Sequence, residues 1–372
     1  MAIIRILKKG KIAVHYFRLE ARLPFKKPLL HPSKLNLMIR YFSIGFLLLL
    51  ATSCATLPKS YQTKDEVITV GAGPEDMVVD TLTEQPRILL SCNSRRKGEA
   101  DYGEIEAYYP ETKTRKVLKR LNEPAGLHFN PHGIDLVLVN AKWPSPTSNL
   151  VLLVVNHERE QHINSILRYH VLKDELVFIN KIVDTLISSP NAVAGFSDGT
   201  LLVSNDAKKH GSNTEVFFML KRAQIVYWNG KDCSVAAEKF CFTNGITIKD
   251  NKKVYLASTR QNKVWQFDFD NGKMINKEVI AKVNGADNLR LDGNDLLVAC
   301  HLRFMMFLKH MKDAHKFSPT TVYRINPTTK KKTVEYFDDG KQISAGSTAL
   351  MFHNNLYVSG IFDAKIVRKG IH

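Results

Sequence analysis

The sequence predicts an all-β protein built as a six-bladed β-propeller, and three observations support this. After residue 60, helical periodicity is scarce, and short apolar or β-branched runs bounded by Gly, Asn, Asp or Pro recur. A polar residue or pair followed by two strands recurs six times, at intervals of about fifty residues. Each interval has room for about four strands, which is the size of one propeller blade.

The N-terminal region precedes this pattern and has a different character. Residues 1–37 carry nine Lys or Arg against one acid, Glu20. Next comes "MIRYFSIGFLLLLATSC", residues 38–54, with a basic start, an apolar stretch and small residues before its cysteine. The apolar stretch of about a dozen residues is shorter than the roughly 20 that span a membrane, and is typical of a cleaved export signal.

We therefore interpret this region as a bacterial lipoprotein signal that leaves Cys54 as the lipidated first residue. An export signal acts at a true N-terminus, so Met38 is the expected start; a basic arm with a membrane anchor is the alternative. The expected location is the bacterial cell envelope, lipid-anchored and extracytoplasmic. The predicted segments are upstream translation (1–37), signal peptide (38–53), linker (54–67) and propeller (68–372).

The net charge of +17 is concentrated in the N-terminal region. From Cys54 onward the chain has 43 basic and 35 acidic residues, with no clustered stripe of Lys and Arg. Proteins that bind nucleic acids usually concentrate Lys and Arg in a patch or stripe, so we expect no nucleic-acid partner. A mildly basic surface is equally compatible with an anionic membrane face.

The four remaining cysteines do not suggest a disulfide framework. Cys233 and Cys241 are close enough in sequence to pair across a hairpin. Cys92 in "ILLSCN" and Cys300 in "LLVACH" have the pattern of small buried strand residues.

The six repeats place polar residues at one equivalent position. They begin with "PEDMVVD" at 74, "PHGIDLVLVN" at 131, "PNAVAGF" at 190, "TNGITIKD" at 243, "DNLRLD" at 287 and "AGSTALMF" at 345. The first strand of each blade lines the central channel of a propeller, so equivalent residues should converge on one axis. These residues are Glu75 with Asp76, His132, Asn191, Asn244, Asp287 with Asn288, and Ser347.

This set favours a central calcium site. Calcium takes roughly six to eight oxygen ligands, whereas zinc prefers nitrogen or sulfur, and the histidines nearby lack matching thiols. Taken singly, each residue is more often structural; Asn244, for example, lies in an "NG" turn dipeptide. The shared repeat position favours the metal site instead. The predicted ligands are Glu75, Asn191, Asn244, Asp287 and Asn288, and the two carboxylates balance the charge of the ion.

Six ordered motifs carry a family resemblance. "GPEDMVVD", "FNPHGIDL", "LLVVNH", "SPNAVAG", "TNGITI" and "ADNLRLDGNDLLVACH" resemble the paraoxonase (arylesterase) family of calcium-dependent lactonases, within the wider gluconolactonase and strictosidine-synthase group of six-bladed propellers. The resemblance covers about residues 68–370 and implies a catalytic calcium held by the same five ligands. It also implies a histidine pair beside the ion, His132 and His157, and places Asp206 and His301 near the pocket.

The chain departs from the family pattern in two places. The family's second, structural calcium would use Asp76, the backbone carbonyl of Ile134 and an Asp that is Ala192 here. Losing one charged ligand weakens the prediction of a second ion. Animal members join their ends by a disulfide, whereas this chain ends "IVRKGIH", so closure should depend on strand pairing alone.

The expected function is calcium-dependent hydrolysis of lactones or aryl esters. The ion would polarise the carbonyl group of the substrate, and water would be the nucleophile. His132 would take the proton of that water, and His157 would orient the imidazole or the water. The alternatives are a non-catalytic, calcium-stabilised binding propeller and a strictosidine-synthase-like relative. Two insertions, 207–222 and 303–317, are expected at the rim, as lids, membrane contacts or packed loops.

Overall fold

The computed structural model describes residues 65–99, 102–140, 148–159 and 161–371. The predicted upstream segment, the signal peptide and Cys54 lie outside the described residues. The first strand, β1 (Glu66–Thr69), begins inside the predicted linker and belongs to the propeller.

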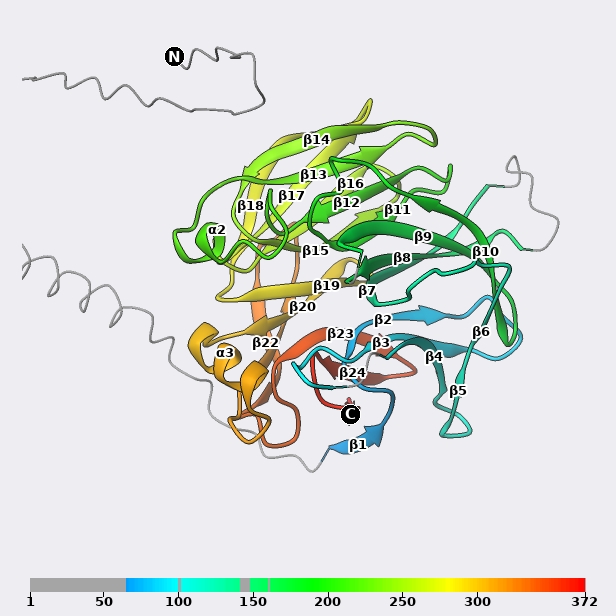
Figure 1. Cartoon of the computed structure of the whole chain (residues 1–372). Coiled ribbons are helices and arrows are strands. Elements are labelled where there is room, and N and C mark those ends of the chain that lie inside the picture. The colour runs from blue at the N-terminus through cyan, green and yellow to red at the C-terminus, as the bar shows by residue number, and fades with distance from the viewer. Residues whose placement is uncertain (1–64, 100–101, 141–147, 160, 372) are drawn as a thin grey trace, which may run out of the picture. The chain divides into compact units, whose positions relative to one another are not determined.

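Six antiparallel sheets form the blades, as predicted (Figure 1). Blade 1 contains β2 (Pro74–Asp80), β3 (Arg87–Asn93), β4 (Gly103–Tyr109) and β5 (Thr114–Val117). Blade 2 contains β7 (Pro131–Leu138), β8 (Leu150–Glu158), β9 (Ile163–Val171) and β10 (Glu175–Ile182), with β6 (Lys119–Leu121) added parallel at its outer edge. Blade 3 contains β11 (Pro190–Gly195), β12 (Leu201–Asn205), β13 (Ala223–Trp228) and β14 (Cys233–Phe240).

The remaining blades follow the same order. Blade 4 contains β15 (Thr243–Lys249), β16 (Lys253–Ser258), β17 (Lys263–Asp270) and β18 (Lys273–Lys282). Blade 5 contains β19 (Ala286–Asp292), β20 (Asp295–His301), β21 (Thr320–Ile325) and β22 (Lys332–Asp338). Blade 6 contains β23 (Gly346–Phe352), β24 (Asn355–Gly360), β25 (Lys365–Gly370) and β1.

The inner strands form a closed ring, in which β2, β7, β11, β15, β19 and β23 contact one another in this cyclic order. β1 completes blade 6 by antiparallel pairing with β25, from Glu66 opposite Arg368 to Thr69 opposite Lys365. Strand pairing therefore closes the ring, as expected. The four cysteines in the described residues are free. Cys233 begins β14 and Cys241 directly follows its last residue, so the two do not lie on facing strands.

The second strand of each blade explains the apolar runs in the sequence. β3 is buried along its whole length, and the second strands of the other blades are almost entirely buried. Both faces of such a strand pack against neighbouring blades, so its apolar residues run continuously instead of alternating.

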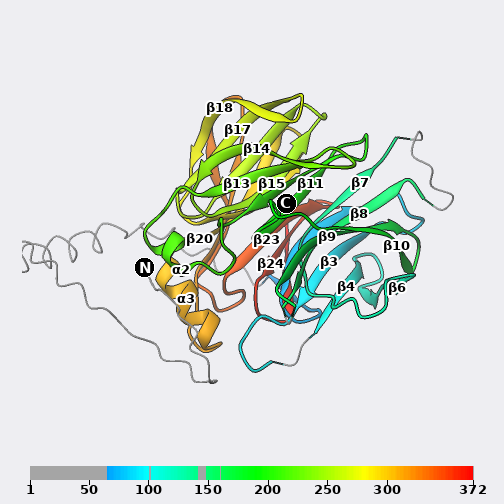
Figure 2. The same ribbon diagram turned by 45° about the horizontal axis from the view of Figure 1, so that its top comes forward.

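Two short helices lie in the two insertions: α2 (Asn213–Phe217) between β12 and β13, and α3 (Phe304–Lys312) between β20 and β21. Arg260 joins them, because its Nε donates to the Val216 carbonyl at 3.2 Å and its guanidinium lies 4.7 Å from the Phe304 ring centre. Figure 2 shows both helices at one margin of the propeller. In the described part of the chain, no helix has the length and apolar character needed to cross a membrane.

Each of the six inner strands carries a β-bulge near its start. The register shifts lie between Pro74 and Asp76, Pro131 and Ile134, Pro190 and Ala192, Thr243 and Ile246, Ala286 and Leu289, and Gly346 and Ala349. A bulge inserts one extra residue and re-aims the side chains next to it. The polar residues predicted to converge lie in these bulges, so local backbone geometry brings them to the channel.

Two bulges contain a glycine that packs against the next blade. A Cβ added at Gly133 would lie 2.5 Å from the Asn191 carbonyl oxygen, and one at Gly245 would lie 2.7 Å from the Asn288 Cα. These distances are shorter than van der Waals contact with backbone atoms that cannot easily move. Glycine at these positions allows adjacent inner strands to approach closely.

We predict that Gly245→Ala lowers the free energy of unfolding by about 1–3 kcal/mol, because the new methyl group displaces backbone of β19. Equilibrium urea unfolding of the purified protein measures this change. The control is Gly293→Ala, at a turn with φ of +59° and nothing within 4 Å of an added Cβ. The control reports the cost of the backbone conformation alone, about 1 kcal/mol. Wild-type stability for Gly245→Ala would contradict the close-packing interpretation.

Candidate active site

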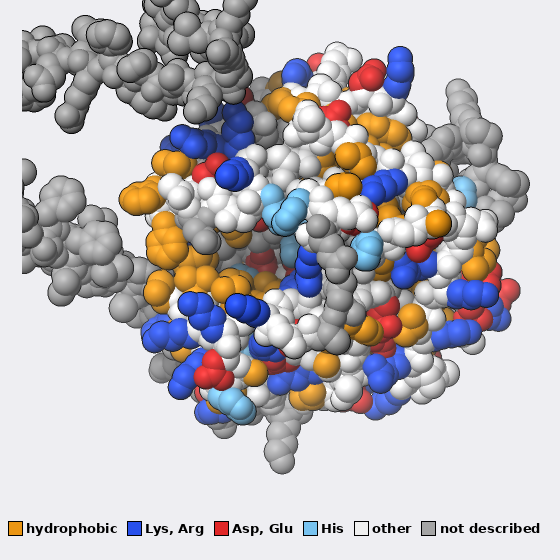
Figure 3. Space-filling view, viewed as in Figure 1, with side chains coloured by type: hydrophobic (Ala, Val, Ile, Leu, Met, Phe, Trp, Pro, Cys, Tyr) orange, Lys and Arg blue, Asp and Glu red, His pale blue; other side chains and the backbone are white. Residues whose placement is uncertain are grey.

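Four of the five predicted ligands contact one another in pairs at the end of the channel where the inner strands begin, and Asn191 lies near the start of the neighbouring inner strand β11. Glu75, Asn191, Asn244, Asp287 and Asn288 are all buried. The Asn244 amide donates to Asp287 Oδ1, and Asn288 hydrogen-bonds the Glu75 carboxylate. Figure 3 shows a hollow in the middle of this face, with acidic side chains inside it and histidine side chains beside it. We call these five residues the hub.

The hub contains buried oxygen atoms that no protein donor satisfies. In the described part of the structure, Asn191 Oδ1, Asn244 Oδ1 and Asp287 Oδ2 are buried without a hydrogen-bond partner. Buried polar atoms without partners are rare, and oxygen atoms of this kind suit a hard cation such as calcium. No three His, Cys, Asp or Glu side chains in the described residues are placed to hold a metal ion, so a hub metal would depend on the amide oxygens.

The charge of the hub also fits a cation. Burial, with Asp76 and Asp287 nearby, raises the pKa of Glu75 to about 8, although Arg95 acts in the opposite direction. A carboxylate with such a pKa lacks sufficient positive charge around it. A divalent ion between Glu75 and Asp287 would supply that charge, so the residues present fit calcium.

Arg95 is a neighbour of the hub that the sequence did not identify. It lies in the β3–β4 loop, where Nη1 donates to the carbonyl oxygens of Gly73 at 2.6 Å and Asn93 at 2.8 Å. Its Nη2 lies 3.4 Å from Glu75 Oε2 and 3.2 Å from His132 Nδ1. The only signal in the sequence is the basic pair of "NSRRKG" directly after a buried strand.

His132 lies between two partners that require opposite tautomers when Glu75 is ionised. Its Nδ1 is 3.3 Å from Glu75 Oε2, and an ionised carboxylate there requires a proton on Nδ1; the Arg95 guanidinium, at 3.2 Å, requires a lone pair on the same atom. Burial, with Arg95 and His157 nearby, holds the pKa of His132 well below its ordinary value. The ring is therefore neutral at physiological pH.

His157 has one defined tautomer. Asn164 Nδ2 donates to the Ser188 carbonyl at 2.7 Å, which turns Asn164 Oδ1 toward His157 Nδ1 at 2.8 Å. His157 must then carry its proton on Nδ1 and a lone pair on Nε2. Burial lowers the pKa of His157 to about 4, and its ring centre lies 5.1 Å from that of His132. The structure thus brings the two predicted histidines together.

A third histidine, His210, extends this pair and was also missed. Its ring centre is 5.3 Å from that of His157, and its Nδ1 is 3.2 Å from Ser189 Oγ. The Ser189 hydroxyl donates to Asp206 Oδ1, so it can only accept from His210. Burial raises the pKa of Asp206 to about 6. Asp206, expected near the pocket, therefore acts on the histidines through Ser189.

His301 lies closer to the hub than expected. Its Nε2 is 2.8 Å from Asp287 Oδ2, although the orientation is not that of a hydrogen bond, so both atoms remain without a hydrogen-bond partner. Its ring stacks on Phe307 of α3 with 4.5 Å between centres. The insertion that carries α3 therefore packs directly on a neighbour of a predicted ligand.

Asp76 and the Ile134 carbonyl also meet, but around a side chain. Arg290 Nη2 lies 2.7 Å from both carboxylate oxygens of Asp76 and 2.7 Å from the Ile134 carbonyl oxygen. These are the two positions predicted for a second calcium. Because a guanidinium group already contacts both, the residues present do not fit a metal ion there.

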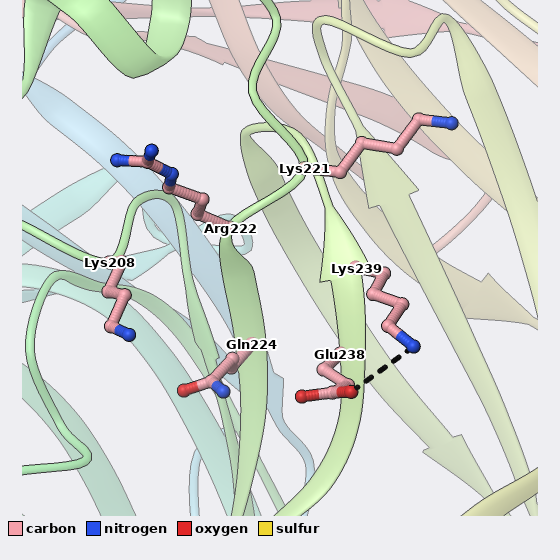
Figure 4. A pocket seen from close by; sticks show the side chains of 6 residues that line it. All are labelled: Lys208, Lys221, Arg222, Gln224, Glu238 and Lys239. Atoms are coloured by element: carbon pink, nitrogen blue, oxygen red, sulfur yellow. Dashed lines mark ion pairs between the residues drawn. The ribbon is translucent and has the colours of Figure 1, made fainter.

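The two insertions rim the hub face. Figure 3 shows hydrophobic side chains gathered along one margin, over α2 and α3. Phe217, Phe218, Met305 and Phe317 are among the exposed large apolar residues. A separate depression, lined by Lys208, Lys221, Arg222, Gln224, Glu238 and Lys239, contains no predicted site residue (Figure 4).

Comparisons with known proteins identify the family of this chain. The arylesterase family model matches residues 93–367. Human serum paraoxonase/lactonase 3 is 25% identical over 244 residues, covering 63% of this chain and 67% of that protein. Serum paraoxonase/arylesterase 1 of Mus musculus is 26% identical over 244 residues, covering 63% and 66%. The matched region thus spans about two thirds of each relative.

Among solved structures, a luciferin-regenerating enzyme superimposes with a TM-score of 0.51 at 13% identity, covering 82% of this chain and 97% of that chain. At that identity the likeness concerns the fold alone. The family model covers well over half of the sequence, including four of the five hub residues and the three neighbouring histidines, His132, His157 and His210. The chain therefore belongs to the arylesterase family.

Proposed function

We propose that this protein is a calcium-dependent hydrolase of lactones or aryl esters, with the hub as its active site. The observation that carries the proposal is the set of three buried oxygen atoms without a hydrogen-bond partner, on Asn191, Asn244 and Asp287. Neutral histidines lie beside them. The relatives named paraoxonase/lactonase and paraoxonase/arylesterase support ester and lactone substrates.

Calcium bound at the hub would supply a Lewis acid that polarises the substrate carbonyl and stabilises the developing oxyanion by several kcal/mol. The protein would hold the oxygen atoms that bind the ion in fixed positions. Glu75 and Asp287 contribute the negative charge, and the buried amides contribute neutral oxygens on bulged strands. This rigid backbone support holds the donors in place.

His132 is the proposed general base. With its Nδ1 proton directed to Glu75, its Nε2 lone pair accepts a proton from the attacking water. The water oxygen bonds to the acyl carbon, the bond to the leaving oxygen breaks, and His132 returns the proton to that oxygen. His157, fixed by Asn164, positions the His132 ring or the water.

Arg95 determines whether His132 can act in this way. When Nδ1 accepts from Arg95, Nε2 carries the proton and the ring is a donor, not a base. When Nη2 instead donates to Glu75 Oε2, His132 Nδ1 can carry the proton and donate to the same carboxylate, while Nη1 stays on the carbonyls of Gly73 and Asn93. The contact between Arg95 and Glu75 therefore links the carboxylate to the state of the histidine.

We also propose that the protein is lipid-anchored at Cys54 and extracytoplasmic in the bacterial envelope. The support is the segment at 38–54, in which a short apolar run precedes small residues and a cysteine. This proposal is independent of the catalytic one.

We expect removal of calcium to abolish hydrolysis of phenyl acetate and of an aliphatic lactone. Asn191→Ala should lower kcat/KM by at least about 100-fold, because it removes a ligand from the ion that stabilises the oxyanion. Steady-state kinetics with and without chelator, together with the calcium content of each protein, measure this.

The matched control for this ligand is Asn294→Ala, at an exposed turn. Full activity in chelator would contradict the proposal. A calcium-stabilised protein that hydrolyses neither substrate would instead be the non-catalytic binding propeller.

We predict that His132→Gln and His157→Gln each lower kcat by about 10²–10⁴-fold while calcium content is retained, because they remove the proton acceptor or its support. Separate measurement of kcat, KM and bound calcium distinguishes loss of the base from loss of the ion. His353→Gln, in an exposed turn, is the control. Unchanged kcat on every substrate for both variants would exclude the histidine mechanism.

The anchor gives a prediction of its own. In bacteria that express the full chain, labelled fatty acid should be incorporated into the wild type and not into Cys54→Ser, and the variant should leave the membrane fraction. The substitution should not change hydrolysis by the purified propeller. Equal labelling of the two proteins would contradict lipidation at Cys54.

A further inference from the structure

We infer that the Arg290 guanidinium is the resident cation of the second polar site in the channel, so that this site binds no divalent metal. The site consists of Asp76, the Ile134 carbonyl and the Met77 carbonyl, and we call it the arginine site. Arg290 Nη2 contacts the first two at 2.7 Å, and Nε donates to Met77 O at 2.9 Å.

The Asp76 carboxylate has no accepting capacity left for a metal ion. Apart from Arg290, it accepts from the backbone N–H groups of Met77 at 2.9 Å and Ile134 at 2.8 Å, and from Thr348 Oγ1 at 2.8 Å. An ionised carboxylate offers about four lone-pair directions. Five donor contacts already use them.

The charges of the arginine site balance without an added ion. Asp76 and Arg290 form a pair with 2% and 12% of their side chains exposed. A divalent ion on the same oxygens would add two positive charges to a carboxylate that Arg290 already neutralises, which buried surroundings strongly disfavour.

Among the described residues, no other side chain replaces the missing acidic ligand of the second calcium. Asp135, on β7, accepts a hydrogen bond from the Gly195 amide through Oδ2. Residue 192 is a buried alanine, whose methyl group cannot bind a metal ion.

The arrangement also ties distant blades together. Arg290 projects from β19, whereas Asp76 lies on β2 and Ile134 on β7. In the cyclic order of inner strands, β19 and β7 are opposite each other. One guanidinium group thus connects three blades across the channel, a role for which its planar set of fixed donors is suited.

The test is calcium binding and thermal unfolding of the intact protein. Wild type should bind at most one calcium per chain, and Asn191→Ala should bind none, because only the hub remains as a metal site. Arg290→Met leaves Asp76 buried without its partner, so the unfolding temperature should fall by about 10 °C. Millimolar calcium should restore part of this loss in chains that also carry Asn191→Ala, where the hub no longer binds the ion.

Arg290→Lys keeps the charge without the planar donors and serves as the milder variant, with a smaller fall in unfolding temperature. Arg324→Met, which breaks partly exposed ion pairs with Asp292, Asp295 and Glu335, controls for the loss of an arginine ion pair and should show no rescue by calcium.

Two calcium ions per wild-type chain, or one retained in Asn191→Ala, would overturn the inference, as would wild-type stability of Arg290→Met. No calcium in the wild type, with Arg290→Met still destabilised, would reject the hub metal but support the arginine site.

Discussion

Six inner strands surround one narrow channel, and a polar group placed there has to be satisfied from another blade. Solvent does not reach Glu75, Asp76 or Asp287, whose side chains are almost completely buried. The bulges at the starts of the inner strands turn these groups toward one another instead of into the sheet ladder. Satisfaction of polar atoms across the axis therefore determines both what the channel can bind and how the blades are held together.

The buried polar groups of the channel are satisfied differently at its two polar sites. The Arg290 guanidinium contacts both carboxylate oxygens of Asp76, so this carboxylate has its counterion and its hydrogen-bond donors within the protein. Around Glu75 and Asp287 the protein leaves oxygen atoms without donors and negative charge without a full counterion. Only an incomplete site of the second kind is available for an exogenous ion and a substrate. The neutral histidines lie beside that incomplete site, where proton transfer is useful.

The sequence was sufficient to predict the six blades and the start of each inner strand, where the polar residues of the repeats lie. Its period marks the inner strands, and a residue such as Asn191 or Asn244 is identified by comparison with its counterparts in other blades. Arg95, His210 and Arg290 were missed because none occupies that repeated position. Arg95 and His210 reach the site from loops, and Arg290 reaches across the channel from a later position on β19. The reach of a long side chain depends on the distance between strands, which a repeat pattern does not encode.

The position of β1 has a mechanical consequence. This strand is the outermost of blade 6 and is held by an antiparallel ladder from Glu66 to Thr69. Tension applied to the chain before Glu66 would run along this strand and shear the ladder at the rim. Glu75 follows on β2, a few residues after Thr69, so the ladder takes up the force before it reaches the donors at the axis. A tether at this end would therefore load the edge of blade 6 first, and would reach Glu75 only after this ladder had separated.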